Sequence, residues 1–331
     1  MALISVIVPS FNNAAHTAAT LGSIITQDYE DLEIIFVNDA STDETPAIAE
    51  RVLRASGRDY RLINHERNSG ESSARNTGLA NSRGEYVCFC DGDDLLERNF
   101  VSSLAKSIAK DDSDISFCGC MKHFEDGRPD ELIPVEVSLL SPLDGETALY
   151  MRMLKPIAPV LCSMLFKKDL ITENNLRFHD GCVAFADIEF ELKAFCHAKR
   201  VSFIPDCLYV YVHGAEMGSV RDADTKAKKL RRYVHSSEAH YRAAEYLSKF
   251  APSERTREIA DEVLLPEAVI RKFTIAARMN DRAAYKSLTH DDSQRKILRR
   301  GLKNFFRKPE IFLKVSAILF TPGLYFTLRK D

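Results

Sequence analysis

The sequence lacks the two glycine-rich strings with which many nucleotide-binding folds hold phosphate. Neither G-x-G-x-x-G, typical of dinucleotide-binding folds, nor G-x-x-x-x-G-K, typical of P-loops, occurs in the chain. Both strings work by letting backbone amides approach the phosphates closely. A nucleotide, if one binds, must therefore be held by acidic side chains and a metal ion rather than by a glycine cradle.

An excess of basic charge and a basic leader are also missing. The chain has 45 Lys and Arg against 48 Asp and Glu, a formal net charge of -3, which gives no overall reason to expect nucleic acid. The first apolar run, residues 3–8, follows no basic segment and leads into polar Ser10 and Asn12. We therefore expect no signal peptide and a cytoplasmic protein.

The eight cysteines do not indicate a disulfide framework. A chain of 331 residues is long enough for about two domains with their own cores. Because the cysteines lie mostly inside apolar segments, we expect reduced, buried thiols. A zinc site of Cys88, Cys90, Cys118 and Cys120 is the alternative, although C-x-C within strands lacks the usual knuckle geometry.

Short β-branched runs alternate with helical patterns over the first 120 residues. The patterns predict strands at 3–8, 33–37, 60–64 and 85–90. They also predict helices at about 16–27 and 72–80, and between them a helix that begins after a capping box at 41–44. Repeated β-α-β units predict an α/β fold with a mainly parallel, doubly wound sheet.

The pattern changes towards the C-terminus. Two closing strands are expected at 201–204 and 208–212, and beyond residue 222 the chain becomes helical and polar. A composition boundary falls near 218–223. This predicts a second, helical region.

Polar side chains follow three of the expected strands. Residues 9–12 follow the first, 38–41 the second, and Asp91-Gly92-Asp93-Asp94 the fourth. Ligands of such sheets bind at the carboxyl ends of the strands. Asp91 and Asp93 leave an extended chain on the same side, and two converging carboxylates suit Mg²⁺ or Mn²⁺. The alternative is a solvated acidic turn with Asp94 as a helix N-cap.

The C-terminal tail combines a basic run with an apolar segment. Residues 295–308 contain seven basic residues and no acid, and residues 311–328 are largely apolar but include Lys314 and Pro322. Eighteen helical residues reach about 27 Å, short of a bilayer core of about 30 Å. A basic amphipathic segment at an anionic membrane surface is favoured. Packing on the protein or a partner, and a true span, are the alternatives.

Four motifs follow one another over about 90 residues, and together they closely resemble family-2 glycosyltransferases of the GT-A fold. The motifs are Ser5-Val6-Ile7-Val8-Pro9-Ser10-Phe11-Asn12, Val37-Asn38-Asp39-Ala40-Ser41-Thr42-Asp43, Asn68-Ser69-Gly70 with Ala74-Arg75-Asn76-Thr77-Gly78, and Phe89-Cys90-Asp91-Gly92-Asp93-Asp94. Looser similarity continues to about Ser219. The resemblance implies a GT-A domain over 1–221, with a nucleotide-binding half at 1–120 and an acceptor half at 121–221, followed by a helical C-terminal region at 222–331.

The resemblance also assigns roles at the nucleotide-sugar site. The acid matched by Asp39 contacts the base of the donor, usually uracil, and Arg75 lies near the donor. Asp91 and Asp93 serve the ribose and the metal-bound diphosphate, the metal being Mn²⁺ or Mg²⁺. The implied set is Pro9, Phe11, Asn12, Asp39, Arg75 and Asp91 for the donor, and Asp93, Asp91 and His213 for the metal ion.

The catalytic base is implied at the start of a helix in the second half. Family members carry Glu-Asp there, and this chain has Ala186-Asp187, so Asp187 matches the base and the preceding glutamate is absent. The alternative is a helix N-cap. The resemblance implies an inverting transfer from a uridine diphosphate sugar to a bacterial surface glycan or lipid-linked acceptor, at the inner face of the cytoplasmic membrane. A non-catalytic sugar-nucleotide-binding or scaffold protein is the other hypothesis.

Overall fold

The computed structural model describes residues 2–135, 141–154, 161–182, 184–214, 226–304 and 307–329, with only the backbone of 226–229. Ser219 and the expected boundary at 218–223 lie outside these residues. The chain divides into two compact units, Met1–Gly145 with Ile157–Cys182 and His197–Asp222, and Glu146–Pro156 with Val183–Cys196 and Ala223–Asp331. The second unit thus includes two segments that the resemblance places within the domain at 1–221.

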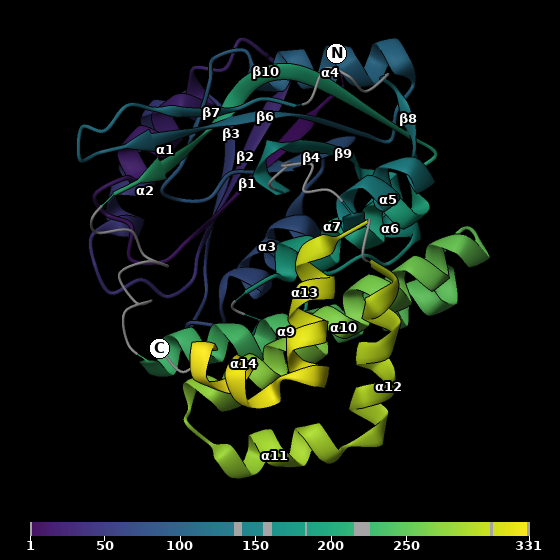
Figure 1. Ribbon diagram of the computed structural model, residues 1–331. Helices are drawn as coiled ribbons and strands as arrows, with labels where there is room; N and C mark the ends of the chain where they lie inside the picture. Colours follow the sequence, from purple (N-terminus) through teal and green to yellow (C-terminus); the bar gives the residue numbers. More distant parts are fainter. Residues whose placement is uncertain are drawn as a thin grey trace. The chain divides into compact units, whose positions relative to one another are not determined.

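A mixed β-sheet forms the centre of the first unit (Figure 1). Its order is β3-β2-β1-β4-β9-β6-β10-β5, with β7 beside β6 and β8 beside β10. The strands are β1 Ile4–Ser10, β2 Leu32–Asn38, β3 Asp59–Asn64, β4 Tyr86–Phe89, β5 Leu95–Leu96, β6 Ile115–Phe124, β7 Glu131–Ile133, β8 Leu143–Asp144, β9 Met164–Lys167 and β10 Arg200–His213. The parallel pairing expected for the first four strands is confirmed, whereas β9 is antiparallel to both β4 and β6.

Helices α1 Thr17–Ile25, α2 Thr45–Ala55 and α3 Glu71–Asn81 follow the parallel strands β1, β2 and β3. Helices α4 Phe100–Asp111 and α6 Lys168–Glu173 follow β5 and β9, which pair antiparallel with their neighbours. Every residue of β1 and β2 is buried, which explains why both strands are continuous apolar runs rather than alternating ones. Helix α3 lies close against β1, because a Cβ atom on Gly78 would be 2.2 Å from Cγ2 of Ile7.

The buried carboxylate of Glu33 holds the amino end of β2, opposite the carboxyl ends of the parallel strands. Glu33 is 1% exposed. It accepts hydrogen bonds from Ser5 Oγ at 2.6 Å and from the Arg83 backbone N–H and Nε at 2.6 and 2.8 Å. Burial would by itself raise the pKa of Glu33, but the hydrogen bonds from Ser5 and Arg83 and the Arg83 charge lower it below its usual value.

Two local expectations are wrong. The strands expected at 201–204 and 208–212 are one strand, β10, with register shifts between Phe203 and Tyr209; the proline at its centre is tolerated because it lies at this irregularity. The capping box at 41–44 does not form, because Asp43 Oδ1 accepts the Thr45 N–H at 3.0 Å and α2 begins at Thr45 without a side-chain cap on Glu44.

The second unit is helical. It contains α5 Gly145–Leu154, of which all but the first residue belongs to it, α7 Ala186–His197 up to Cys196, α9 Lys226–Phe250, α10 Glu254–Arg278, α11 Arg282–His290, α12 Asp292–Gly301, α13 Pro309–Phe320 and α14 Pro322–Arg329. Helix α10 packs against α9, α11, α12, α13 and α14, so it is the core of this unit. The helical region expected after residue 222 is present in the described part of the chain.

The basic run of the tail is partly paired within the second unit. Arg300 lies 2.8 Å from Asp261, and Lys303 and Arg307 lie 2.8 and 3.0 Å from Glu262. Both acids are on α10, and the sequence separation hides these pairs. The run is therefore not the free cationic face that its composition suggests.

The apolar tail folds as two helices with two kinds of surface. Five of its large side chains are buried, namely Ile311, Val315, Ile318, Tyr325 and Phe326, whereas Leu313, Phe320, Leu324 and Leu328 are exposed. Among the described residues no single helix is long and apolar enough to cross a bilayer. Helices α13 and α14 meet that criterion only together, and they are bent by 117°.

Candidate functional site

The loops after β1 and β2 are tied to each other at the carboxyl edge of the sheet. The Asn12 N–H donates to Ser41 Oγ at 3.0 Å, and Asn12 Oδ1 accepts the Thr42 N–H at 2.8 Å. Asn12 has a φ of 52°, a conformation that asparagine tolerates better than most residues. Asn12 of the predicted donor set therefore connects the two loops. We call these loops and the turn at 91–94 the rim. Phe11, beside Asn12, remains 42% exposed.

Asp39 holds the loop that follows β3. Its Oδ1 accepts the Ser69 N–H at 2.9 Å and pairs with His65 Nδ1 at 2.7 Å, and its Oδ2 accepts the Gly70 N–H at 2.7 Å. His65 Nε2 lies 3.0 Å from Thr77 Oγ1 on α3. Asp39 is only 2% exposed. The carboxylate expected to meet the donor base thus already stabilises residues 65–70.

Arg75 connects α3 to the acidic turn after β4. Its Nη2 donates to Glu71 Oε1 at 2.6 Å and to Asp91 Oδ1 at 2.7 Å, and the guanidinium lies over the Phe178 ring at 5.5 Å from the centroid. Burial disfavours the charged form, yet the nearby Glu71 and Asp91 carboxylates raise the pKa of Arg75 well above its usual value. Its buried Nε has no hydrogen-bond partner among the described residues, so one donor remains for a ligand oxygen.

The turn that contains Asp91 and Asp93 packs tightly against β1. A Cβ atom on Gly92 would be 2.7 Å from Ser10 Oγ and 3.0 Å from the Pro9 carbonyl oxygen, so only glycine lets the turn approach this closely. Asp91 and Asp93 remain partly exposed. The structure thus brings Pro9 and the two predicted carboxylates to one edge of the sheet.

Asp94 is the third acid of this motif, and its surroundings differ from those of the N-cap in the alternative. It is fully buried, accepts the Val212 N–H at 2.9 Å and accepts a hydrogen bond from the Tyr209 hydroxyl. Burial, together with the Asp91 and Asp93 charges, raises the pKa of Asp94 well above its usual value. The alternative of a solvated turn with Asp94 as an N-cap is wrong, because Asp94 instead fixes the turn to β10.

His213 is the last residue of β10. Its ring stacks on Phe124 at a centroid distance of 5.2 Å and meets the edge of Tyr211 at 4.4 Å. Burial, with smaller effects of the Lys122 and Arg128 charges, lowers the pKa of His213, and its buried Nε2 has no hydrogen-bond partner within the described ranges. A neutral imidazole offers one nitrogen lone pair to a cation.

The predicted metal ligands are not assembled in advance. In the part of the chain that the structure describes, no group of three or more His, Cys, Asp and Glu is spaced to hold a metal ion. This applies to Asp91, Asp93 and His213, and equally to the four-cysteine zinc alternative. All eight cysteines are free. Mg²⁺ is commonly bound by one or two carboxylates together with substrate phosphates, so two acids on a rim remain a suitable partial site.

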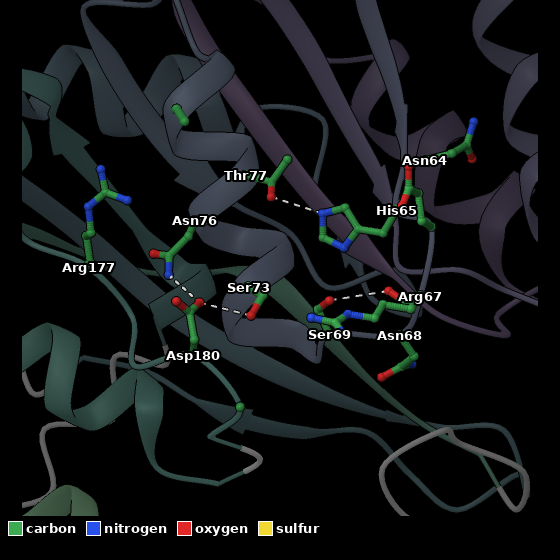
Figure 2. A pocket seen from close by; sticks show the side chains of 13 residues that line it. Asn64, His65, Arg67, Asn68, Ser69, Ser73, Asn76, Thr77, Arg177 and Asp180 are labelled. Atoms are coloured by element: carbon green, nitrogen blue, oxygen red, sulfur yellow. Dashed lines mark hydrogen bonds between the residues drawn. The ribbon is translucent and has the colours of Figure 1, made fainter.

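A pocket of about 1030 Å³ opens beside this rim, and no predicted site residue lines it (Figure 2). Its walls are the loop at 64–69, the face of α3 that carries Ser73, Asn76 and Thr77, and the loop at 177–181. The predicted site residues come from the ends of the first, second and fourth strands. The 64–69 wall lies at the end of the third strand, β3, and the same rule applied to that strand indicates it.

Asp187 belongs to the second unit, whereas the donor residues belong to the first. It is the second residue of α7, so it is not the N-cap that the alternative required. One turn further along, Glu191 pairs with Arg152 Nε at 2.5 Å, and the Asp187 charge acts on the same guanidinium. Burial opposes the charge on Arg152, but the two carboxylates raise its pKa.

The sheet defines an α/β protein of the class whose ligands bind at the carboxyl ends of parallel strands. The family Glycosyl transferase family 2 matches residues 5–171, and the chain belongs to that family. The family resemblance drawn from the four motifs is therefore confirmed.

Individual proteins agree with this assignment. A relative described as an uncharacterized glycosyltransferase, EpsJ of Bacillus subtilis (strain 168), is 34% identical over 212 residues, which are 63% of this chain and 60% of the relative. The chain thus spans about three fifths of that protein.

Two solved structures show the same fold. TarS 1-349 of S. aureus in complex with UDP-GlcNAc has a TM-score of 0.68 at 20% identity, covering 99% of this chain and 88% of its own. The mannosyltransferase PcManGT of Pyrobaculum calidifontis, in complex with GDP-Man and Mn²⁺, has a TM-score of 0.53 at 20% identity, covering 97% and 88%. The expected glycosyltransferase fold with a helical C-terminal region is confirmed.

Proposed function

We propose that this protein is an inverting, metal-dependent glycosyltransferase that moves a sugar from a uridine diphosphate donor to a hydroxyl of a bacterial surface glycan or lipid-linked acceptor. The observation that carries the proposal is the Arg75–Asp91 pair, with Asp93 beside it, at the rim of a family-2 chain. The ligands of the two solved structures, UDP-GlcNAc and GDP-Man with Mn²⁺, support a nucleotide-sugar donor and a divalent cation.

The rim residues have distinct tasks in donor binding. Phe11, exposed beside Asn12, supplies a flat apolar surface for the base. Asp39, together with the Ser69 and Gly70 amides that it holds, forms the polar side of a recess proposed for the base, and the base shares the carboxylate with these two amides. The unpartnered Nε of Arg75 donates to a diphosphate oxygen, while its Nη2 keeps Asp91 in place.

The side chains present fit a divalent cation. Asp93 and Asp91 supply hard oxygen ligands, and the neutral ring of His213, whose Nε2 lacks a partner in the described part of the chain, is suited to complete the shell. When bound, Mn²⁺ or Mg²⁺ offsets the negative charge that develops on the departing diphosphate. Asp94 keeps the two ligating carboxylates at a fixed position through its bonds to β10.

Asp187 is proposed as the base that accepts the proton of the acceptor hydroxyl while that oxygen attacks the anomeric carbon. The Arg152 guanidinium, which pairs with Glu191, also interacts electrostatically with this carboxylate. No second carboxylate is assigned as a nucleophile, so a single displacement with inversion is the economical mechanism.

Transfer assays separate this proposal from a non-catalytic sugar-nucleotide-binding protein, which Ala186 in place of the family's glutamate favours. Turnover of uridine diphosphate sugars with Mn²⁺ is measured for the parent, Asp93→Asn and Asp187→Asn. We expect Asp93→Asn to lose donor affinity, and Asp187→Asn to keep uridine diphosphate affinity while turnover falls by about 100-fold or more. Asp59→Asn, which changes an exposed acid, is the matched control. Equal turnover in all four proteins, or none in the parent, refutes the proposal.

The exposed apolar residues of α13 and α14 support location at a membrane surface. Leu313, Phe320, Leu324 and Leu328 are proposed to enter the headgroup region at the inner face of the cytoplasmic membrane. The basic residues of 295–308 that form no ion pair within the described ranges are proposed to face anionic lipid. Nucleic acid is not among the proposed partners.

A further inference from the structure

The pocket at 64–80 and 177–181 is separate in composition from the donor rim. Its lining contains no aromatic ring apart from the imidazole of His65 and no aliphatic side chain larger than that of Ala80. A nucleotide base or an acyl chain would find nothing to stack on or to bury against. The pocket is therefore suited to a ligand that is polar over its whole surface.

The walls carry both hydrogen-bond donors and acceptors. The amides of Asn64 and Asn68 and the hydroxyls of Ser73 and Thr77 line the pocket, whereas the Asn76 amide is held by Phe178 and Asp180. Asp180 accepts hydrogen bonds from Ser73 Oγ at 2.9 Å and Asn76 Nδ2 at 3.1 Å, which fixes the carboxylate against α3, as Figure 2 shows. Sugar hydroxyls both donate and accept, so such walls match a saccharide.

Two arginines face this pocket without an acidic partner. Arg67 on the 64–69 loop and Arg177 on the opposite loop are exposed, and neither forms an ion pair within the described residues. Glu66 and Asp180 also line the pocket, so cations and anions balance. A bare phosphate would meet as much repulsion as attraction, whereas a guanidinium can hold two neighbouring hydroxyls of a sugar through its fork of N–H groups.

The size of the pocket indicates more than one sugar unit. At about 1030 Å³ it reaches the upper end of the range of small-molecule sites, roughly 300–1,000 Å³. An open, polar site without stacking surfaces binds each unit weakly, and a chain of units compensates by simultaneous contacts.

We propose that this pocket is a second carbohydrate site, which holds a segment of an oligosaccharide away from the donor rim. Its identification as part of the acceptor glycan rests on the proposed function, but binding itself does not. The 64–69 wall continues into Ser69 and Gly70, whose amides bond to Asp39, so the same loop borders the pocket and the recess proposed for the donor.

The test is glycan-array binding of the full chain, with an array of bacterial surface oligosaccharides as the probe, for the parent and an Arg67→Ala/Arg177→Ala variant. We expect the parent to bind oligosaccharides, and the variant to lose at least tenfold in affinity for the same glycans. The matched control is Arg51→Ala/Arg54→Ala, which removes two exposed arginines from α2 and should change affinity less than twofold.

Two further measurements complete the design. Hydrolysis of a uridine diphosphate sugar without acceptor should be equal within twofold in all three proteins. If hydrolysis is absent while glycans still bind through the pocket, the proposed function fails and the carbohydrate site stands. The site is refuted if the array shows no binding, if the variant binds as the parent does, or if inorganic phosphate alone occupies the pocket.

Discussion

Replacing Asp39 by asparagine tests whether this carboxylate is a structural anchor before any nucleotide binds. Its two oxygens accept two backbone N–H groups and pair with His65. In Asp39→Asn one oxygen remains, and the new amide group faces the Gly70 N–H across the present 2.7 Å contact, donor against donor. Losing one charge-assisted hydrogen bond and leaving a buried donor unpaired costs about 1–3 kcal/mol.

Urea denaturation of the nucleotide-free protein measures this cost. For a unit of this size 1 kcal/mol corresponds to roughly 2–4 °C in Tm. The Tm of the first unit should therefore fall by about 2–12 °C in Asp39→Asn. The Gly70 amide should also exchange its hydrogen faster. Asp59→Asn, at an exposed acid that pairs with Arg83, should cost about 1 kcal/mol or less.

The contrary outcome is equally defined. If Asp39→Asn is as stable as the parent without nucleotide and only its affinity for uridine diphosphate falls, the carboxylate serves the donor alone, and the anchoring role is refuted.

Three further changes have expected results. Gly78→Ala should destabilise the first unit by about 1–3 kcal/mol, because the new methyl group would overlap Ile7. Gly22→Ala is the control: its new methyl group meets nothing within 4 Å, so it should be neutral or stabilise α1. Chemical denaturation of both variants measures this, and a destabilised Gly22→Ala beside an unaffected Gly78→Ala would contradict it. Glu33→Gln should lower the free energy of unfolding by about 1–3 kcal/mol at pH 7. Since the pKa of Glu33 is lowered in the folded protein, the extra stability of the parent is present above pH about 4.3 and is lost as the pH falls through the lowered pKa. Denaturation at several pH values measures this, and a stability difference independent of pH would count against it. Phe320→Ser, at a side chain 72% exposed, should weaken sedimentation with anionic vesicles while leaving Tm unchanged; undiminished sedimentation would remove Phe320 from the membrane surface.

The sequence was sufficient for the parallel half of the sheet and for the acidic rim. Strands β1 and β2 are buried on both faces, so their apolar runs are unambiguous. The strand ends then indicate the edge at which Asp91 and Asp93 emerge. Both inferences depend on neighbours close in the chain.

The remainder depends on partners far away in sequence. Asp94 meets Tyr209 and Val212, 115 and 118 residues further on, and no local pattern distinguishes such a buried aspartate from a solvated one. Similarly, the acids on α10 that pair with the basic run precede it by about 40 residues. The pocket arises from loops a hundred residues apart, so its volume exists only in three dimensions.

The attachment of Asp94 to β10 has a consequence for how this protein can be rebuilt. The turn after β4 and the terminal histidine of β10 are clamped to one strand, so their spacing is independent of whatever polypeptide follows position 214. Grafting a relative's helices after that point should therefore leave the proposed cation ligands at their present spacing while changing only the C-terminal helical region.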